Sequence, residues 1–257
     1  AAHGQSSVIA GGEDNTANAS FASIGGGLNN TATGSWGTIA GGLENSVLDS
    51  WGTIAGGGQN IVSASWGTIA GGGNNVAAHA STIGGGLYNG AYASYATIGG
   101  GYYNRVYTPW GTVAGGVYNG VYGSYSTVGG GGYNRVYADW ATIAGGYDIY
   151  VYGYAAAVGG GYRNTAYSSY ATVAGGYFNA ASERSAVGGG SYNRAYSNWG
   201  TIAGGYSNYI YASWGTIGGG SSNYVYYPWG TVAGGHNNYV TGYAATVGGG
   251  MYNSAYY

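Results

Sequence analysis

The chain contains no cysteine and no lysine, only two prolines, and charged residues at 5% of its 257 positions. The absence of cysteine excludes disulfides and thiolate metal ligands. A formal net charge of −2 gives no electrostatic basis for holding nucleic acid or an anionic membrane. No apolar run is long enough to be inserted in a bilayer. Glycine (59 residues) and tyrosine (32 residues) dominate instead, so the composition is far from that of an ordinary globular domain.

One short unit repeats throughout the chain. Residues 35–57, SWGTIAGGLENSVLDSWGTIAGG, show it restarting after fifteen residues. If the Ile or Val before each glycine run is taken as the anchor, there are seventeen units, with two intervals of fourteen residues instead of fifteen. Each anchor is followed by Gly at the second and third positions and by Ala, Val or Ile at the eighth. Asn occupies the sixth position in sixteen units, and Ile149 is the exception.

This repeat predicts an all-β fold, a parallel β-solenoid or β-roll of about seventeen 15-residue coils. Each unit has two short alternating segments separated by a glycine corner, and this much glycine disfavours helices by about 1 kcal/mol per residue relative to alanine. We expect a single uninterrupted solenoid over residues 1–257, with Tyr-free coils in residues 1–87 and Tyr-rich coils in residues 88–257. Stacking at about 4.8 Å turns every repeat position into a ladder.

Two apolar columns are expected to face inward, the anchor and the small residue eight positions later. We also expect the Asn side chains to turn inward and to bond backbone groups and the Asn of the adjacent coil. The paired glycines are interpreted as corners that need positive φ or close backbone approach, since no helix pattern or Lys follows them. The predicted core ladder is Ile39, Ile54, Ile69, Ile98, Val113, Val128 and Ile143, and the predicted Asn ladder is Asn45, Asn60, Asn75, Asn104, Asn119 and Asn134.

Aromatic side chains are expected to cover the outside. All eight tryptophans lie three residues before an anchor, where alternation in a strand would turn them outward together with the Thr that precedes most anchors. Tyrosines repeat nine positions after the anchor. Such a surface exceeds the apolar patch that a soluble monomer normally exposes, so we predict lateral contacts through it. The predicted ladders are Trp36, Trp51, Trp66, Trp199, Trp214 and Trp229, and Tyr92, Tyr107, Tyr122, Tyr137, Tyr152 and Tyr167.

The stretches NTANASFASIGGG (15–27) and NTATGSWGTIAGG (30–42) resemble the head repeats of trimeric autotransporter adhesins. The resemblance holds at the level of the repeat. It implies a left-handed parallel β-roll, an extracellular location, and a role in attachment or surface display. The units of this chain are longer than those of that family and richer in Tyr and Trp. The first residue is Ala1 rather than Met, which fits removal of a secretory signal and equally fits a trimmed polypeptide.

The sequence predicts no enzyme and no cofactor. The histidines His3, His79 and His236 lie in separate corners or termini without partners at metal-ligand or catalytic spacing. A calcium-binding repeat would need an Asp in each turn, which is absent.

Two functions are considered. The first is a secreted structural subunit that polymerises head to tail into a surface or matrix fibre, with possible lateral or trimeric association. Its end-to-end interface would contain Val8, Ile9, Val247 and Ala255. The alternative is an adhesin head or binding module that recognises glycans or a cell surface. Ice binding needs a flat Thr array, and we disfavour it because Trp lies two residues from Thr.

Overall fold

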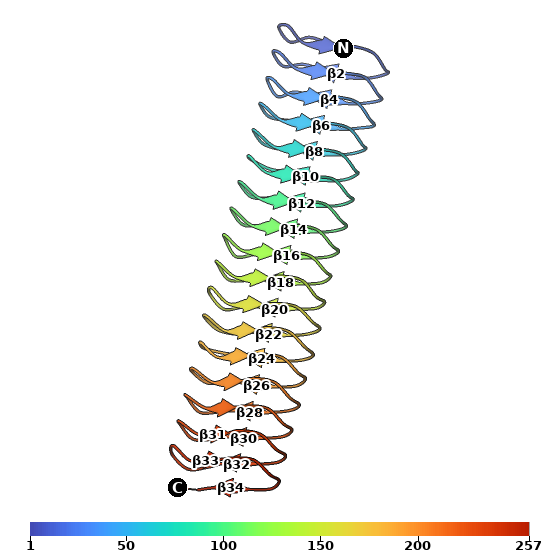
Figure 1. The fold of residues 1–257 in the computed structure, drawn as a ribbon. Coiled ribbons are helices and arrows are strands. Elements are labelled where there is room, and N and C mark those ends of the chain that lie inside the picture. The colour runs from blue at the N-terminus through green and yellow to red at the C-terminus, as the bar shows by residue number, and fades with distance from the viewer. Residues whose placement is uncertain (257) are drawn as a thin grey trace. The chain divides into compact units, whose positions relative to one another are not determined.

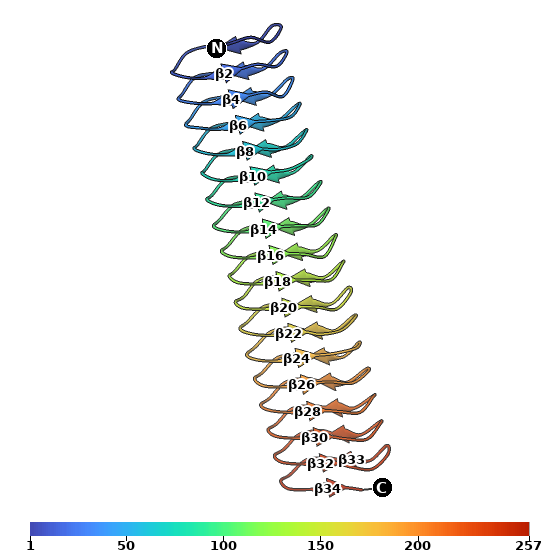
Figure 2. The ribbon, with the colours of Figure 1, turned by 180° about the vertical axis from the view of Figure 1, so that it is seen from behind.

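The computed structural model describes residues 1–256, in which every regular element is a β-strand of two residues. The chain is divided into two compact units, residues 1–131 and residues 132–257. Within each unit the coils stack on one another with their strands parallel (Figures 1 and 2), which confirms the prediction of an all-β parallel solenoid. Residues 1–256 contain no helix that is long and apolar enough to cross a membrane.

Each coil of the first unit contributes one strand to an anchor row, which holds the anchor residues, and one to a second row. The anchor row contains β1 (Val8–Ile9), β3 (Ser23–Ile24), β5 (Thr38–Ile39), β7 (Thr53–Ile54), β9 (Thr68–Ile69), β11 (Thr82–Ile83), β13 (Thr97–Ile98), β15 (Thr112–Val113) and β17 (Thr127–Val128). The second row contains β2 (Thr16–Ala17), β4 (Thr31–Ala32), β6 (Ser46–Val47), β8 (Ile61–Val62), β10 (Val76–Ala77), β12 (Gly90–Ala91), β14 (Arg105–Val106) and β16 (Gly120–Val121).

The second unit has the same two rows. Its anchor row contains β19 (Thr142–Ile143), β21 (Ala157–Val158), β23 (Thr172–Val173), β25 (Ala186–Val187), β27 (Thr201–Ile202), β29 (Thr216–Ile217), β31 (Thr231–Val232) and β33 (Thr246–Val247). Its second row contains β18 (Arg135–Val136), β20 (Tyr150–Val151), β22 (Thr165–Ala166), β24 (Ala180–Ala181), β26 (Arg194–Ala195), β28 (Tyr209–Ile210), β30 (Tyr224–Val225), β32 (Tyr239–Val240) and β34 (Ser254–Ala255).

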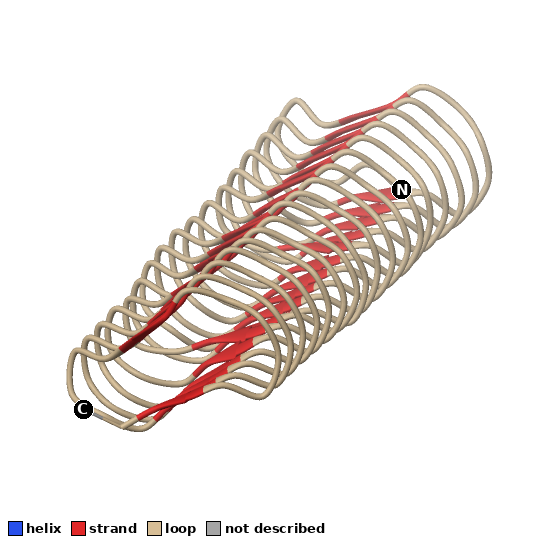
Figure 3. Ribbon diagram, turned by 60° about the horizontal axis from the view of Figure 1, so that its bottom comes forward, coloured by secondary structure: helices blue, strands red, loops and turns tan. Residues whose placement is uncertain are grey.

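The register places like residues on like residues. In the first unit Ile39 lies beside Ile54, and Val47 lies beside Val62. The two fourteen-residue intervals keep this alignment, because Ile69 pairs with Ile83 and Val173 pairs with Val187. Figure 3 shows the strands of both units in separate rows joined by loops. The strands are far shorter than the usual five to six residues, so each coil depends on its neighbours rather than on its own strand length.

The interior is filled by three columns rather than two. All seven residues of the predicted core ladder are fully buried, as is the second-row residue of their coils. A third inward column, which the sequence analysis missed, lies two residues before the anchor and contains Gly, Ala or Ser. A methyl group on Gly52 would lie 2.7 Å from both Val47 Cγ1 and Val62 Cγ1, so small residues are required wherever that space is already occupied.

The six predicted Asn ladder residues are buried at one corner of the coils. Asn45 shows the pattern: its Nδ2 donates to the carbonyl oxygens of Gly41 (3.1 Å) and of Gly57 in the next coil (2.9 Å). Its Oδ1 accepts the backbone N–H of Asn60 at 3.0 Å. Each amide therefore links its own corner to the following coil and satisfies buried backbone groups that no strand pairs.

Two positions in each coil use an uncommon backbone conformation. In each coil the residues three before and five after the anchor have positive φ, for example Trp51 (φ 64°) and Glu44 (φ 55°). The backbone N–H of Trp51 donates to Ser35 in the preceding coil, whereas that of Thr53 donates to Gly67 in the following coil. The expectation that Trp alternates with the anchor within a strand is therefore wrong, because β7 begins at Thr53 and Trp51 belongs to a left-handed corner.

Candidate functional site

Stacked aromatic rings form an exposed column on the first unit. Phe21, Trp36, Trp51 and Trp66 follow one another with centroid separations of 4.0, 5.1 and 5.1 Å and interplanar angles of at most 10°. Each indole stays roughly half exposed despite its stacking, from 45% for Trp51 to 56% for Trp66. The second unit repeats the arrangement with Trp199, Trp214 and Trp229 at 5.3 and 4.9 Å. We call these residues the Trp column.

The Tyr column, nine positions after the anchor, is also stacked and exposed. Tyr92, Tyr107 and Tyr122 in the first unit have centroid separations of 5.3 and 5.0 Å. Tyr137, Tyr152 and Tyr167 in the second unit have separations of 5.0 and 6.1 Å. Parallel rings this close cover part of one another's faces and stabilise their strands by about 0.5–1.5 kcal/mol per pair. The remainder of each ring is exposed to solvent.

A further column, seven positions after the anchor, was missed by the sequence analysis. These residues start the second-row strands and face outward beside the Tyr column. We call it the strand-face column. In the second unit Tyr209, Tyr224 and Tyr239 stack within it at 5.4 and 5.0 Å. Tyr224 also stacks beside Tyr226 of the Tyr column at 6.0 Å, so the two columns form one tyrosine surface. The signal was a Tyr recurring two residues before the Tyr column.

Arginines occupy other places in the strand-face column and lie over tyrosine rings. Arg105 lies 5.0 Å from the ring centre of Tyr103 and donates to Tyr92 Oη at 2.8 Å. Arg194 lies 5.5 Å from the ring centre of Tyr209 and donates to its Oη at 2.7 Å. Each guanidinium takes the place of a ring in the stack and makes a cation–π contact with a neighbouring ring.

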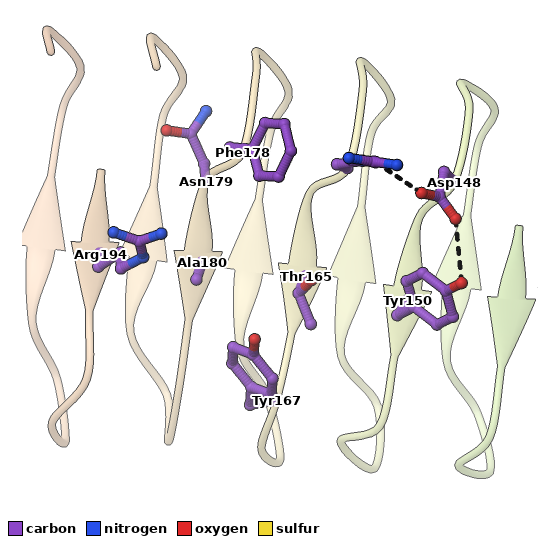
Figure 4. A pocket seen from close by; sticks show the side chains of 9 residues that line it. Asp148, Tyr150, Thr165, Tyr167, Phe178, Asn179, Ala180 and Arg194 are labelled. Atoms are coloured by element: carbon purple, nitrogen blue, oxygen red, sulfur yellow. Dashed lines mark hydrogen bonds and ion pairs between the residues drawn. The ribbon is translucent and has the colours of Figure 1, made fainter. Parts of the chain in front are cut away.

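One region of the second unit collects polar and charged groups around a hollow of about 290 Å³. Figure 4 shows Tyr150 and Arg194 at its two ends, with Thr165 and Ala180 between them. Along one side, Arg163 Nε donates to Asp148 Oδ2 at 2.8 Å and Tyr150 Oη donates to Asp148 Oδ1 at 3.0 Å. Arg135 Nη1 donates in turn to Tyr150 Oη at 2.9 Å, so these four side chains form one connected network.

Several tyrosines of the second unit titrate above their ordinary range. Burial raises the pKa of Tyr152, and the neighbouring Tyr137 and Tyr167 raise it further. Burial also raises the pKa of Tyr150, helped by its hydrogen bond to Asp148 and opposed by Arg135. The raised pKa values keep these tyrosines protonated and neutral at physiological pH, as hydrogen-bonding groups.

Arg184 interrupts the Trp column at the shortened coil between Val173 and Val187. Its guanidinium lies 5.5 Å from the ring centre of Tyr170 and 5.7 Å from that of Trp199, and these three residues line a second hollow of about 350 Å³. The arginine therefore bridges two rings two coils apart.

The residues proposed for end-to-end contact differ in burial. Val8 is 53% exposed, and Ile9 and Ala255 are half-buried. Their counterparts in neighbouring coils, Ile24 and Val240, are fully buried, and Val247 is buried as well. Three of the four predicted residues thus present apolar surface.

The histidines do not form a common site. His79 and His236 make edge contacts with Tyr95 and Tyr252 at 5.9 and 5.7 Å. Among residues 1–256 no group of three His, Asp or Glu side chains is placed to hold a metal ion.

No protein-family model matches the chain, and no curated protein matches it. The resemblance to adhesin head repeats consequently stays a prediction.

Proposed function

We propose that this chain is a non-catalytic structural protein of the cell surface or extracellular matrix. In this proposal, copies join end to end into a fibre and contact one another laterally through the Trp and Tyr columns. The extracellular location derives from the resemblance to adhesin head repeats. The observation that carries the proposal is that successive coils bind through one recurring interface.

That interface is head-to-tail, because one face of each coil binds the opposite face of the next coil. Thr38 N–H donates to Gly52 at 2.9 Å, and Thr53 N–H donates in the same way to Gly67 at 2.9 Å. The Asn ladder repeats with the same period. A coil can therefore receive a coil from another copy as it receives its own neighbour, and a contact of this kind generates an open filament rather than a closed ring.

Lateral association is supported by the outer columns. Exposed rings recur in coil after coil, at 46% for Trp36, 45% for Trp51 and 43% for Trp214. Continuous apolar surface of this extent marks an interaction face in soluble proteins. Copies that align side by side would bury these rings between them, and arrays of identical side chains on neighbouring copies can interdigitate.

Electron microscopy of the purified polypeptide over a concentration series tests the proposal. We expect filaments whose number and length grow with concentration and whose diffraction shows a spacing of about 4.8 Å along the axis. Ala255→Asp should shorten the filaments, because Ala255 is only half-buried and the change places a charge against the coil-to-coil interface. Ser254→Asp is the matched control, since Ser254 is exposed in the same strand. Short uniform particles at every concentration, or equal filament lengths for both variants, would contradict end-to-end assembly.

A second candidate function is a binding module that recognises glycans. The specific observation in its favour is the hollow between Tyr150 and Arg194, where charged groups, hydroxyls and ring surfaces converge. Binding of the wild-type chain to a glycan array, without filament formation, would favour this candidate over the fibre.

A further inference from the structure

The hollow of the second unit arises from a gap in the strand-face column. Tyr150, Thr165, Ala180 and Arg194 occupy this column in four successive coils, with Tyr150 paired to Thr165 and Ala180 paired to Arg194 across their strands. Where the column is filled, at Tyr209, Tyr224 and Tyr239, one ring follows another at 5.0–5.4 Å. Two consecutive small residues therefore leave out two side chains, and the resulting space of about 290 Å³ is near the lower limit for small-molecule sites.

Ring surfaces close the gap at one end and along one side. Arg135 lies 5.6 Å from the ring centre of Tyr150 on the side of the preceding coil, while Thr165 follows Tyr150 in the column and supplies no ring. Tyr167 stacks on Tyr152 at 6.1 Å, and the next coil has Ser182 in its place. Both rings thus lack the stacking partner that a continuous column would provide.

Charge differs between the two sides of the gap. Arg163 is neutralised by Asp148, with 2.8 Å between Nε and Oδ2. Arg194 has a tyrosine hydroxyl as its hydrogen-bond partner and no carboxylate. A ligand carboxylate at that end would give Arg194 the bidentate partner that guanidinium geometry favours.

We propose that this hollow is a binding site for an acidic saccharide of the uronate class. The sugar ring packs its C–H surface against Tyr150 and Tyr167, and its carboxylate pairs with Arg194. Its hydroxyls bind Asp148, Arg163 and Thr165, which line the hollow. A purely aromatic ligand would offer no hydrogen bonds to these polar groups and no charge to Arg194, and that mismatch is costly in a shaped site. The site does not depend on end-to-end assembly, so each proposal can fail without the other.

Titration of the 257-residue chain with a galacturonic acid disaccharide, followed by calorimetry or NMR, tests the proposal. We expect the neutral galactose disaccharide to bind at least about tenfold more weakly, because it lacks the charge that pairs with Arg194. Inorganic phosphate is the competing probe. If phosphate binds as tightly as the disaccharide and displaces it, the site is an anion site and the proposal is wrong.

Filling the hollow gives the sharpest variant. Ala180→Tyr inserts a ring at a column position where Tyr209 and Tyr224 already fit, so the fold should be kept and the thermal midpoint unchanged or raised. Disaccharide binding should be lost. Val76→Tyr, at the same column position in the first unit, is the matched control and should bind as the wild type does. Binding that survives in Ala180→Tyr would overturn the proposal.

Removing the charge of Arg194 shows whether this side chain binds the carboxylate or whether the net positive charge of the surface attracts the ligand. Arg194→Gln should weaken binding of the acidic disaccharide at least about tenfold and leave the weak binding of the neutral one unchanged. Arg105→Gln removes an arginine from the same column position in the first unit and should have no effect. An equal loss in both variants would show that net charge, rather than the hollow, attracts the ligand.

Discussion

The Tyr-free coils around residues 36–66 and the Tyr-bearing coils around residues 209–239 have different outer surfaces on the same interior. Both regions carry stacked tryptophans, with Trp36 and Trp51 at 5.1 Å and Trp214 and Trp229 at 4.9 Å. Only the second region adds a tyrosine surface, in which Tyr209 and Tyr224 stack at 5.4 Å. Inside, both regions bury an Ile or Val anchor, a second apolar residue and an Asn. The inner columns determine the coil, and the outer columns can change without changing it.

The largest loss of stability should follow substitution of the glycine three positions after the anchor, and it should be equal in both regions. Gly57 has φ +89° and Gly220 has φ +84°, and a methyl group on either would overlap the carbonyl oxygen of the next coil's glycine. We expect Gly57→Ala and Gly220→Ala each to cost about 4 kcal/mol or more, because a strained φ and a backbone clash add. Chemical denaturation with amide hydrogen exchange around the altered coil measures this.

The glycine two positions after the anchor provides the control. A methyl group on Gly71 would meet no atom within 4 Å, and its φ lies outside the left-handed region. Gly71→Ala should therefore change stability by no more than about 0.5 kcal/mol. If Gly71→Ala were as harmful as Gly57→Ala, backbone geometry would not explain the paired glycines.

The Asn ladder should rank second. Asn60→Ala removes donors to Gly56 and Gly72 and the acceptor for the N–H of Asn75 at 3.1 Å. We expect a loss of about 3 kcal/mol, since these buried groups are left unsatisfied. Asn208→Ala should cost the same in the Tyr-bearing region. Unequal losses by thermal unfolding would show that the outer layer influences the interior.

The second unit also contains a natural interruption of this ladder. Ile149 donates its N–H to Asn134 Oδ1 at 3.1 Å, yet it offers no oxygen to the N–H of Asn164. Ile149→Asn restores that acceptor and gives up buried apolar area. The equivalent Asn60 makes three such hydrogen bonds, each worth about 0.5–1.5 kcal/mol, whereas burial of an Ile side chain is worth about 1.5–3 kcal/mol. We therefore expect a gain of about 1 kcal/mol. A loss comparable to that of Asn60→Ala would mean that the position no longer accommodates an amide.

Stacking at the left-handed corner should have a smaller effect. Trp51→Gly loses the contacts with Trp36 and Trp66 and relieves a φ of 64°, so the two terms partly cancel and we expect a net loss of about 1 kcal/mol. Trp51→Val loses the same stacking without relief and should be about 1–2 kcal/mol worse than Trp51→Gly. Thermal unfolding ranks the variants, and Val equal to Gly would argue against corner strain.

The sequence predicts the inner columns well, because burial imposes the same choice in every coil. Ile39, Asn45 and Val47 repeat as a set, and that period alone predicts the solenoid. It predicts the corners less well, since positive φ at Trp51 follows from the direction of its N–H bond to the preceding coil. The sequence does not predict the hollow at Thr165 and Ala180. Small residues leave an open space there only because their column faces outward, and the repeat pattern does not show which way that column faces.

The smallest expected difference between the two regions is their response to alkali. Burial and neighbouring tyrosines raise the pKa of Tyr211, Tyr224 and Tyr226, whereas residues 1–87 contain no tyrosine. A tyrosine whose folded pKa exceeds its unfolded value of about 10 favours folding at lower pH. That contribution is complete below pH ~10 and is lost as pH rises through the raised folded values, because the folded state resists ionisation of the phenol.

Limited proteolysis between pH 8 and 12, with fragments identified by mass spectrometry, compares the regions within one molecule. Above pH ~10 cleavage should begin in the Tyr-bearing coils around residues 209–239 and spare the Tyr-free coils around residues 36–66. Tyr224→Phe removes one ionising phenol from the centre of the stack and should shift the onset of cleavage there to higher pH. Simultaneous cleavage of both regions would show that the tyrosine surface does not couple its ionisation to the stability of the coils beneath it.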